Sequence, residues 1–449
     1  MFRSTHILSG DTLYERPPQT IREFQTALDR LRVRQAAFAA LDAGERAALL
    51  EAFAGRLEAA KGRLARMICE EVGRCLRECE AELAKSVELV RHCARTAPAL
   101  LSPQTVPTPA ARSEIHFAPL GIVFAVMPWN YPVWQILRFA VPALCAGNAC
   151  AVKPAPSVAR ISATLFDTVS DSLPLIPAWL AHGDVEHAIA AADAFAFTGS
   201  AATGRKLAAA AAGRLKKSVL ELGGSNPFIV LPDADLQQAA RDACYSRFRD
   251  AGQSCNAAKR IILVGETAEP FIRLFLAECA KLKSGDPFDP ATTLAPMHRA
   301  DLREKLHMQV QDAVAHGAIL LCGGYLPEGK GTFYPATVLD RVPPGCRAYR
   351  EELFGPAAAI LRARDPQHAV ALANDNPYGL GASIYTADER AARHYAALLQ
   401  TGAVYVNRHT SSDLRLPFGG IKDSGYGREL SEFGLYEFAN IKTYRQNQP

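Results

Sequence analysis

The stretch that decides the fold class is Ala194-Phe195-Ala196-Phe197-Thr198-Gly199-Ser200. Its apolar first half predicts a buried strand, and Thr198-Gly199-Ser200 is typical of a helix start, here of an Ala-rich helix that continues through Ala212. A second strand is expected at residues 218–222. A strand, a helix and a strand in this order indicate parallel strands joined by a crossover helix.

The same alternation extends along most of the chain. Further strands are expected at residues 115–117, 121–127, 149–153, 226–231, 260–264, 318–321 and 357–361, with helices near residues 157, 271–282 and 302–316. Residues 20–97 carry apolar side chains at helical spacing and predict several amphipathic helices. Because 449 residues exceed one ordinary domain, we expect an α/β protein with two doubly wound α/β lobes.

Composition and charge exclude several classes of protein. Hydrophobic residues at 49% and charged residues at 21% are average for a globular protein. The net charge of +4 is small and its cations are scattered, so nucleic-acid binding is not expected. Residues 1–19 lack an apolar signal core, and apolar stretches such as residues 115–127 are too short to span a bilayer. We expect a cytoplasmic protein that does not bind membranes.

The chain has 11 cysteines without a Cys-x-x-Cys pair, and no His cluster, so no metal site is expected. Most of these cysteines are interpreted as small buried residues in a reducing compartment. Cys255 differs, because Gly252-Gln253-Ser254-Cys255-Asn256 places its thiol after a glycine turn among polar residues. Taken alone, such a cysteine is more often structural than catalytic.

Two further stretches favour a catalytic thiol. Pro128-Trp129-Asn130-Tyr131-Pro132 ends one apolar strand with an amide side chain, and Glu221-Leu222-Gly223-Gly224-Ser225-Asn226-Pro227 ends another with a carboxylate. Judged singly, a turn Asn and a solvated Glu explain them as well. The three stretches together, in this order, resemble the aldehyde dehydrogenase superfamily from about residue 20 to the C-terminus. Further matches are Lys153-Pro154, Phe197-Thr198-Gly199-Ser200, Glu351-Glu352-Leu353-Phe354-Gly355-Pro356, Pro417-Phe418-Gly419-Gly420-Ile421-Lys422 and Ser424-Gly425.

The resemblance implies a mechanism for these residues. The Cys255 thiolate attacks the aldehyde carbon, and the Asn130 amide with the Cys255 backbone N–H stabilises the oxyanion. Hydride then passes to a nicotinamide cofactor and leaves a thioester, which a water activated by Glu221 hydrolyses. The separation of Glu221 and Cys255, 255 − 221 = 34 residues, matches the family's usual spacing.

No G-x-G-x-x-G follows a strand, so the commonest dinucleotide fingerprint is absent. The resemblance implies instead that the helix beginning at Thr198-Gly199-Ser200 directs its N–H groups toward a pyrophosphate, although an ordinary capped helix would look the same. Pro156 stands where many NAD-specific members carry Glu, so we expect both NAD and NADP to be used. The implied cofactor-binding residues are Trp129, Lys153 at the adenosine ribose, Gly199, Ser200, Leu222, Glu352 at the nicotinamide ribose and Phe354 near the nicotinamide.

The substrate side of the site depends on two arginines. Asn130, Trp134 and Arg138 are spaced by four, so a helix after Pro132 brings them near one face. Arg138 has apolar neighbours and needs an anionic partner, either a substrate carboxylate or a protein carboxylate. Arg249 lies six residues before Cys255, and arginines at these two offsets bind the distal carboxylate in succinate-semialdehyde dehydrogenases.

The resemblance thus implies oxidation of succinate semialdehyde or a close ω-carboxy aldehyde such as glutarate semialdehyde. Guanidinium groups suit such a carboxylate because they can bind it with two hydrogen bonds. Gln135, beside Trp134, is similar to the short bacterial succinate-semialdehyde dehydrogenases, and Ser411 or Ser412 is expected to add a hydrogen bond. Gln135 and Ser412 therefore join Arg138 and Arg249 as expected substrate-binding residues.

The resemblance also divides the chain. It implies a Rossmann-like cofactor domain (1–101 and 120–222), a catalytic domain (223–425) and a β oligomerisation arm (102–119 and 426–449), in a homodimer or homotetramer. Three alternatives stay open: an aldehyde dehydrogenase of other specificity, a CoA-acylating semialdehyde dehydrogenase, and a silent relative kept as a structural or binding protein. Glu221 disfavours the CoA-acylating enzyme, and intact Cys255, Asn130 and Glu221 disfavour the silent relative.

Overall fold

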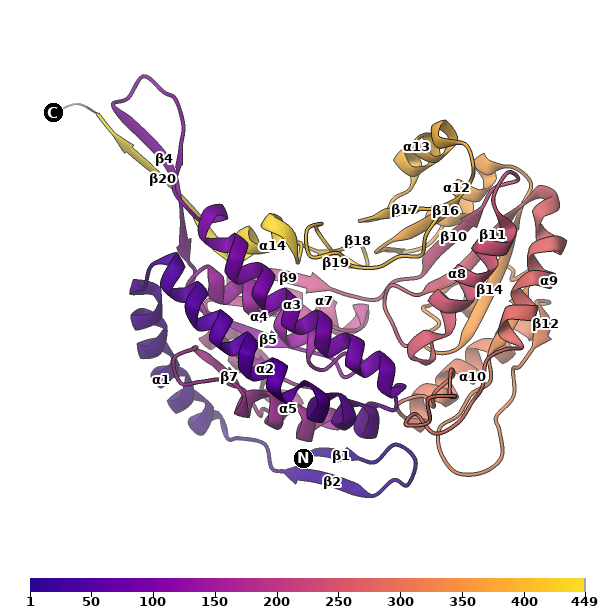
Figure 1. Cartoon of the computed structure of the whole chain (residues 1–449), viewed down its shortest axis with the longest axis horizontal. Helices are drawn as coiled ribbons and strands as arrows, with labels where there is room; N and C mark the ends of the chain where they lie inside the picture. The colour runs from indigo at the N-terminus through magenta and orange to yellow at the C-terminus, as the bar shows by residue number, and fades with distance from the viewer. Residues whose placement is uncertain (448–449) are drawn as a thin grey trace.

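The computed structural model describes residues 1–447 and begins with a small hairpin followed by three long helices (Figure 1). The hairpin consists of β1 (Phe2–Thr5) and β2 (Thr12–Arg16), and the helices are α1 (Ile21–Ala40), α2 (Ala43–Val72) and α3 (Leu76–Leu100). Capping boxes fix the first two helix starts: Thr20 with Glu23, and Asp42 with Glu45. The amphipathic helices predicted over residues 20–97 are therefore confirmed.

The first lobe is built on a six-stranded sheet whose strands β5 to β9 are all parallel. In spatial order the strands are β19 (Gly425–Tyr426), β9 (Lys217–Glu221), β8 (Ala194–Thr198), β5 (Ile122–Val126), β6 (Ala149–Lys153) and β7 (Leu175–Pro177). The crossover helices are α4 (Trp134–Cys145), α5 (Ala159–Asp167), α6 (Val185–Ala191) and α7 (Ala201–Ala212). The strand predicted at Ala194–Thr198 and the helix through Ala212 are both present.

The register of this sheet gathers its polar strand ends at one edge. Val126 pairs with Lys153 and with Phe197, and Thr198 pairs with Glu221, so the carboxyl ends of β5, β6, β8 and β9 lie side by side. In a doubly wound sheet this edge is where ligands bind. The residues that follow β5 and β8 therefore lie close to Lys153 and Glu221.

The second lobe contains a seven-stranded sheet, parallel except for β12. In spatial order its strands are β12 (Ile319–Cys322), β13 (Thr337–Asp340), β14 (Ala357–Ala363), β11 (Ala258–Val264), β10 (Asn226–Val230), β16 (Ala382–Tyr385) and β17 (Val404–Val406). Its helices are α8 (Leu236–Phe248), α9 (Ala268–Cys279), α10 (Ala300–Ala315), α11 (Arg347–Arg350), α12 (Pro366–Asn374) and α13 (Glu389–Leu398). The chain moves from the first sheet to the second between β9 and β10, which confirms the two-lobed α/β fold.

A three-stranded arm extends from the first lobe and carries the C-terminal strand (Figure 1). It consists of β3 (Gln104–Thr105), β4 (Arg112–Pro119) and β20 (Ala439–Gln446), and β20 pairs with β4 along its whole length. The remaining elements are β15 (Tyr378–Gly379), β18 (Ile421–Lys422), α14 (Ser431–Glu437) and the single turns η1 (Pro156–Val158), η2 (His182–Asp184), η3 (Arg249–Gly252) and η4 (Gly265–Thr267). No helix in residues 1–447 is both long enough and apolar enough to cross a membrane.

Candidate active site

Two pockets meet at Cys255 and Gln135, the two residues that line both of them. The first, which we call the basic pocket, has a volume of about 170 Å³ and is lined by α3, α4, η3 and the segment at residues 411–412. The second, which we call the α7 pocket, has a volume of about 400 Å³ and borders the first turn of α7. A thiol at their junction can contact one ligand in each pocket.

Cys255 is partly buried and follows a tightly constrained turn. Asp250, Ala251 and Gly252 all have left-handed backbone angles, with φ of 54°, 50° and 69°. A Cβ on Gly252 would lie 2.4 Å from the Arg247 Nη2 and the Gly355 carbonyl oxygen, so only glycine fits there. Burial raises the pKa of the Cys255 thiol, while the nearby Arg138 and Lys259 favour its thiolate.

Asn130 is buried against the loop that carries Cys255. Its Nδ2 donates a hydrogen bond to the Gln253 carbonyl oxygen at 3.0 Å, which ties the end of the β5 loop to the segment before the thiol. A side-chain amide carries two N–H groups, so one donor remains for a ligand. Asn130 also lines the α7 pocket, next to Cys255.

Glu221 ends β9 and is buried, but it lines neither pocket. Burial, and then the Glu429 carboxylate, raises the pKa of Glu221 well above its ordinary value, although Arg138 and Arg428 oppose this shift. Its Oε1 has no hydrogen-bond partner among residues 1–447. Burial therefore favours the neutral form of this carboxyl group, and because Glu221 lines neither pocket its side chain must rotate to reach a water beside Cys255.

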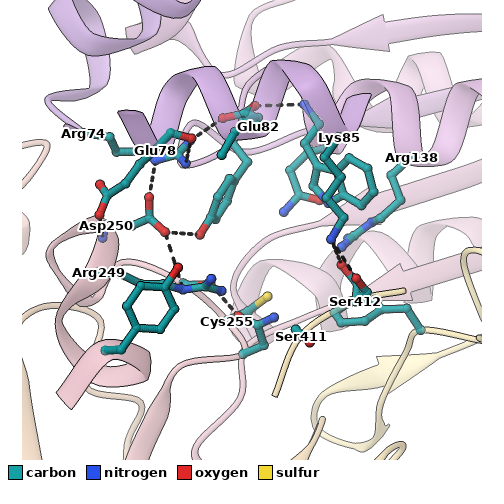
Figure 2. A pocket seen from close by; sticks show the side chains of 18 residues that line it. Arg74, Glu78, Glu82, Lys85, Arg138, Arg249, Asp250, Cys255, Ser411 and Ser412 are labelled. Atoms are coloured by element: carbon teal, nitrogen blue, oxygen red, sulfur yellow. Dashed lines mark hydrogen bonds and ion pairs between the residues drawn. The ribbon is translucent and has the colours of Figure 1, made fainter. Parts of the chain in front are cut away.

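The basic pocket is surrounded by buried ion pairs (Figure 2). Arg74 pairs with Glu82, and its Nε also pairs with Asp250 at 2.5 Å. The Tyr131 hydroxyl donates a hydrogen bond of 2.5 Å to Asp250, and Arg249 lies 3.9 Å from the same carboxylate. Asp250 thus accepts hydrogen bonds from the Arg74 and Tyr131 side chains, whereas Arg249 is close enough to attract it electrostatically but does not donate a hydrogen bond to it.

Arg138 has an anionic partner within the protein. Arg138 on α4 forms a buried ion pair with Glu429, so the protein carboxylate considered from the sequence is present. The guanidinium still lines the basic pocket, and its Nη2 is buried without a hydrogen-bond partner among residues 1–447. Arg138 is therefore charge-neutralised on one side and keeps a free donor.

Sequence reasoning missed Lys85 and Arg74, which also line the basic pocket. The Lys85 Nζ donates hydrogen bonds to the Ser412 carbonyl oxygen, at 2.9 Å, and to the Ser412 hydroxyl. A signal was available in α3, because Glu78, Glu82 and Lys85 are spaced by four and three and share one helix face. The helical spacing of apolar residues over 20–97 predicts amphipathic helices but does not indicate that one of them lines a pocket.

The α7 pocket contains six of the seven expected cofactor-binding residues: Trp129, Gly199, Ser200, Leu222, Glu352 and Phe354. Glu352 pairs with the buried Lys259 and accepts a hydrogen bond from the Gly224 N–H at 3.2 Å. A Cβ on Gly223 would lie 2.4 Å from the Glu352 Oε2, so the glycine allows this close approach. The pocket thus combines a helix N-terminus, aromatic rings and a fixed carboxylate, which fits a long ligand with a phosphate and a flat ring.

Lys153, the seventh residue, lies at the end of β6 and lines neither pocket. Its amino group lies 5.3 Å from the centroid of the Phe2 ring, and burial lowers the pKa of Lys153 to about 8. The register of β5, β6 and β8 nevertheless brings it to the same sheet edge as the first turn of α7. An adenosine at this edge would lie within reach of it.

Comparisons with known proteins agree with this geometry. The chain is 45% identical over 393 residues to the succinate semialdehyde dehydrogenase [NAD(P)+] Sad of Escherichia coli K12, covering 86% of this chain and 85% of that protein. It is 40% identical over 427 residues to a probable NADP+ succinate-semialdehyde dehydrogenase of Synechocystis, covering 94% of each. The crystal structure of a succinic semialdehyde dehydrogenase from Streptococcus pyogenes with NADP+ superposes with a TM-score of 0.96, at 29% identity over 100% of both chains. Since the family model described as Aldehyde dehydrogenase family matches residues 3–444, the chain belongs to the aldehyde dehydrogenase family.

Proposed function

We propose that this protein oxidises succinate semialdehyde, or a close aldehyde with a distal carboxylate, to the acid with NAD+ or NADP+. The observation that carries the proposal is the position of Cys255, which lies where a cation-lined pocket meets a pocket that fits a dinucleotide. The names of the similar enzymes from E. coli and Synechocystis support the same substrate and both cofactors.

The proposed reaction uses three residues in order. The Cys255 thiolate attacks the aldehyde carbon, and the free Asn130 N–H and the Cys255 backbone N–H stabilise the resulting oxyanion. When bound, NAD(P)+ would accept the hydride that leaves the tetrahedral carbon. Glu221 then rotates toward the thioester, takes a proton from water and so generates the nucleophile that releases the acid.

The proposed cofactor site extends across the α7 pocket. The first-turn N–H groups of α7, together with Gly199 and Ser200, are suited to bind a pyrophosphate. Glu352 is suited to bind the nicotinamide ribose, and Phe354 and Trp129 are suited to contact the nicotinamide ring. Lys153 is suited to the adenosine ribose. Pro156 offers no carboxylate to repel a 2′-phosphate, which supports use of NADP+ as well as NAD+.

Arg249 provides the sharpest test of the substrate. We propose that Arg138, Arg249, Gln135 and Ser412 bind the distal carboxylate. Arg249→Leu should raise the KM for succinate semialdehyde at least about ten-fold, because a charged hydrogen bond is lost. Butanal, which has a methyl group in place of the carboxylate, serves as the neutral comparison. Equal kcat/KM values of the wild-type enzyme for the two aldehydes, or a KM that ignores Arg249→Leu, would overturn the proposal.

Two rivals can be separated by product and binding measurements. A CoA-acylating enzyme would make succinyl-CoA when CoA is present, whereas the proposed enzyme makes succinate with or without CoA. A silent binding protein would show no turnover. Cys255→Ala should abolish turnover while NADPH binding, followed by fluorescence, is retained.

The remaining expectations belong to this proposal. We assign residues 1–101 and 120–222 to the cofactor domain, 223–425 to the catalytic domain, and 102–119 with 426–449 to an oligomerisation arm in a homodimer or homotetramer. The extended β4 and β20 pair, with Ile441 and Tyr444 exposed, supports a role of the arm in assembly. A thiol nucleophile needs a reducing compartment, which favours the cytoplasm.

A further inference from the structure

The α3 helix contributes one cation to the basic pocket, Lys85. Its amino group donates to the Ser412 carbonyl oxygen and hydroxyl, and it lies 4.5 Å from the centroid of the Trp134 ring. All its identified contacts are therefore with neutral groups. Figure 2 shows Lys85 reaching from α3 across the pocket to Ser412, with its amino group beside the Arg138 guanidinium.

Lys85 differs from the other pocket cations in having no carboxylate partner. Within residues 1–447, no carboxylate oxygen lies within 4.0 Å of its amino group, whereas Arg74 has Glu82 and Asp250, Arg138 has Glu429, and Arg249 has Asp250. Burial, and then Arg138 and Arg249, lowers the pKa of Lys85 to about 8. A half-buried ammonium among cations costs free energy unless an anion joins it.

Arg138 has a matching unused donor. Its Nη2 is buried without a hydrogen-bond partner among residues 1–447, and Arg138 lines the same pocket. One ammonium, one guanidinium N–H and the Ser412 hydroxyl thus lie together (Figure 2), and within residues 1–447 no carboxylate oxygen lies within 4.0 Å of the ammonium. A carboxylate can accept from all three, because its two oxygens offer about four acceptor positions.

Resting on the proposed function, we propose that Lys85 binds the distal carboxylate of the aldehyde together with Arg138 and Ser412, and so selects carboxylated substrates. In Figure 2 Arg249 lies on the side of the pocket away from Lys85, near Asp250 and Cys255, and it contributes a third positive charge. The carboxylate of the product meets the same groups, so succinate should act as a competitive inhibitor through Lys85.

The test compares kcat/KM for succinate semialdehyde with kcat/KM for butanal. In Lys85→Gln, which keeps a donor for Ser412 but removes the charge, this ratio should fall at least about ten-fold, mainly through KM for succinate semialdehyde. The inhibition constant of succinate should rise by a similar factor. Lys85→Arg, which keeps the cation, should restore most of the selectivity.

Arg95→Met is the matched control. It removes an exposed cation of the same helix that pairs with Glu88 outside the pocket, and the ratio should not change. A selective wild-type enzyme whose Lys85→Gln variant keeps both the ratio and the succinate inhibition would overturn the assignment of Lys85 alone. Equal loss on both aldehydes would also overturn it, because that result indicates a structural tether for residues 411–412. A wild-type enzyme without preference for succinate semialdehyde would overturn the proposed function and this inference together.

Discussion

At the scale of single residues, burial disfavours ionisation of the proposed nucleophile Cys255 and of the proposed general base Glu221. The pKa of the Cys255 thiol and that of the Glu221 carboxyl are both raised, for Glu221 with a further contribution from Glu429. Thiolate and carboxylate are the reactive forms. Activity should therefore depend on how far each group is ionised and should increase as the pH rises.

This situation predicts a rising pH profile. Because a raised pKa means that ionisation is completed only at higher pH, kcat should increase from about pH 6 to about pH 9 rather than level off near neutrality. Steady-state rates in overlapping buffers at constant ionic strength measure the profile. A flat profile between pH 6 and pH 9 would show that neither group titrates there during turnover.

Glu221→Gln separates the two groups. The amide cannot take a proton from water, so the thioester on Cys255 should accumulate and steady-state kcat should fall about 100-fold or more. A burst of NADPH close to one equivalent per active site should remain in rapid-mixing experiments. Loss of the burst together with kcat would instead indicate that Glu221 acts before hydride transfer.

At the scale of elements, the turn η3 holds the loop of Cys255 in position. Three consecutive left-handed residues are stabilised by the contacts of Asp250 with Arg74 and Tyr131 and by the donation of Arg247 to the Gly252 and Gly355 carbonyl oxygens. Backbone strain of this kind persists only where the surroundings enforce it. The loop should respond strongly to changes in either its backbone or its ion pairs.

Gly252→Ala tests the backbone. Its new methyl group would collide with Gly355 and Arg247 at a left-handed position, so the free energy of unfolding should fall by about 2 kcal/mol and activity should drop sharply. Gly62→Ala is the matched control, because Gly62 lies at an exposed position of helix α2 with no atom near the new methyl group, and the variant should gain about 0.5 kcal/mol. Urea unfolding measures both variants, and equal stabilities would contradict the strain at Gly252.

Arg74→Met tests the ion pairs. It would leave the buried Glu82 without a cation and Asp250 with only the more distant Arg249, and such a loss costs about 3 kcal/mol or more. Arg95→Met, which breaks an exposed pair, should change the free energy of unfolding by less than about 1 kcal/mol. Thermal melts of the wild type and the two variants compare their stabilities. An Arg74→Met enzyme as stable as the wild type would mean that both carboxyl groups take up protons instead.

At the scale of the whole molecule, the three-stranded arm of β3, β4 and β20 extends away from the first lobe (Figure 1). Strand β20 pairs along its length with β4, yet seven of its eight residues are exposed, and Figure 1 shows the arm extending from the body. Exposed apolar side chains on a sheet that projects into solvent favour contact with another subunit.

Truncation after Phe438 tests this assembly. Without β20 the arm loses its outer strand, so the enzyme should elute as a monomer while the two-lobed body remains folded. Light scattering gives the mass and circular dichroism the fold. A truncated protein that keeps the mass of the wild-type oligomer would exclude the arm as the principal contact.

The helices and strands could be predicted because their signals are local, and the assignment of Cys255, Asn130 and Glu221 as reactive residues, which stays a prediction, rests on local motifs as well. The strand at Ala194–Thr198 follows from a short apolar run, the helix through Ala212 from an alanine-rich segment, and Cys255, Asn130 and Glu221 from motifs a few residues long. Each of these patterns depends on neighbours along the chain, where side-chain direction and backbone preference are set by the residue types themselves.

Only the tertiary structure decided the partners of these residues. Arg138 meets Glu429, Lys85 meets Ser412 at a separation of 327 residues, and Glu221 lies outside both pockets. Such contacts depend on how α3, α4 and the C-terminal segment pack together, and no local pattern encodes which distant carboxylate satisfies a buried cation. The sequence by itself determined the fold class and the reactive thiol, whereas packing decided which cations of the pocket remain free for a substrate.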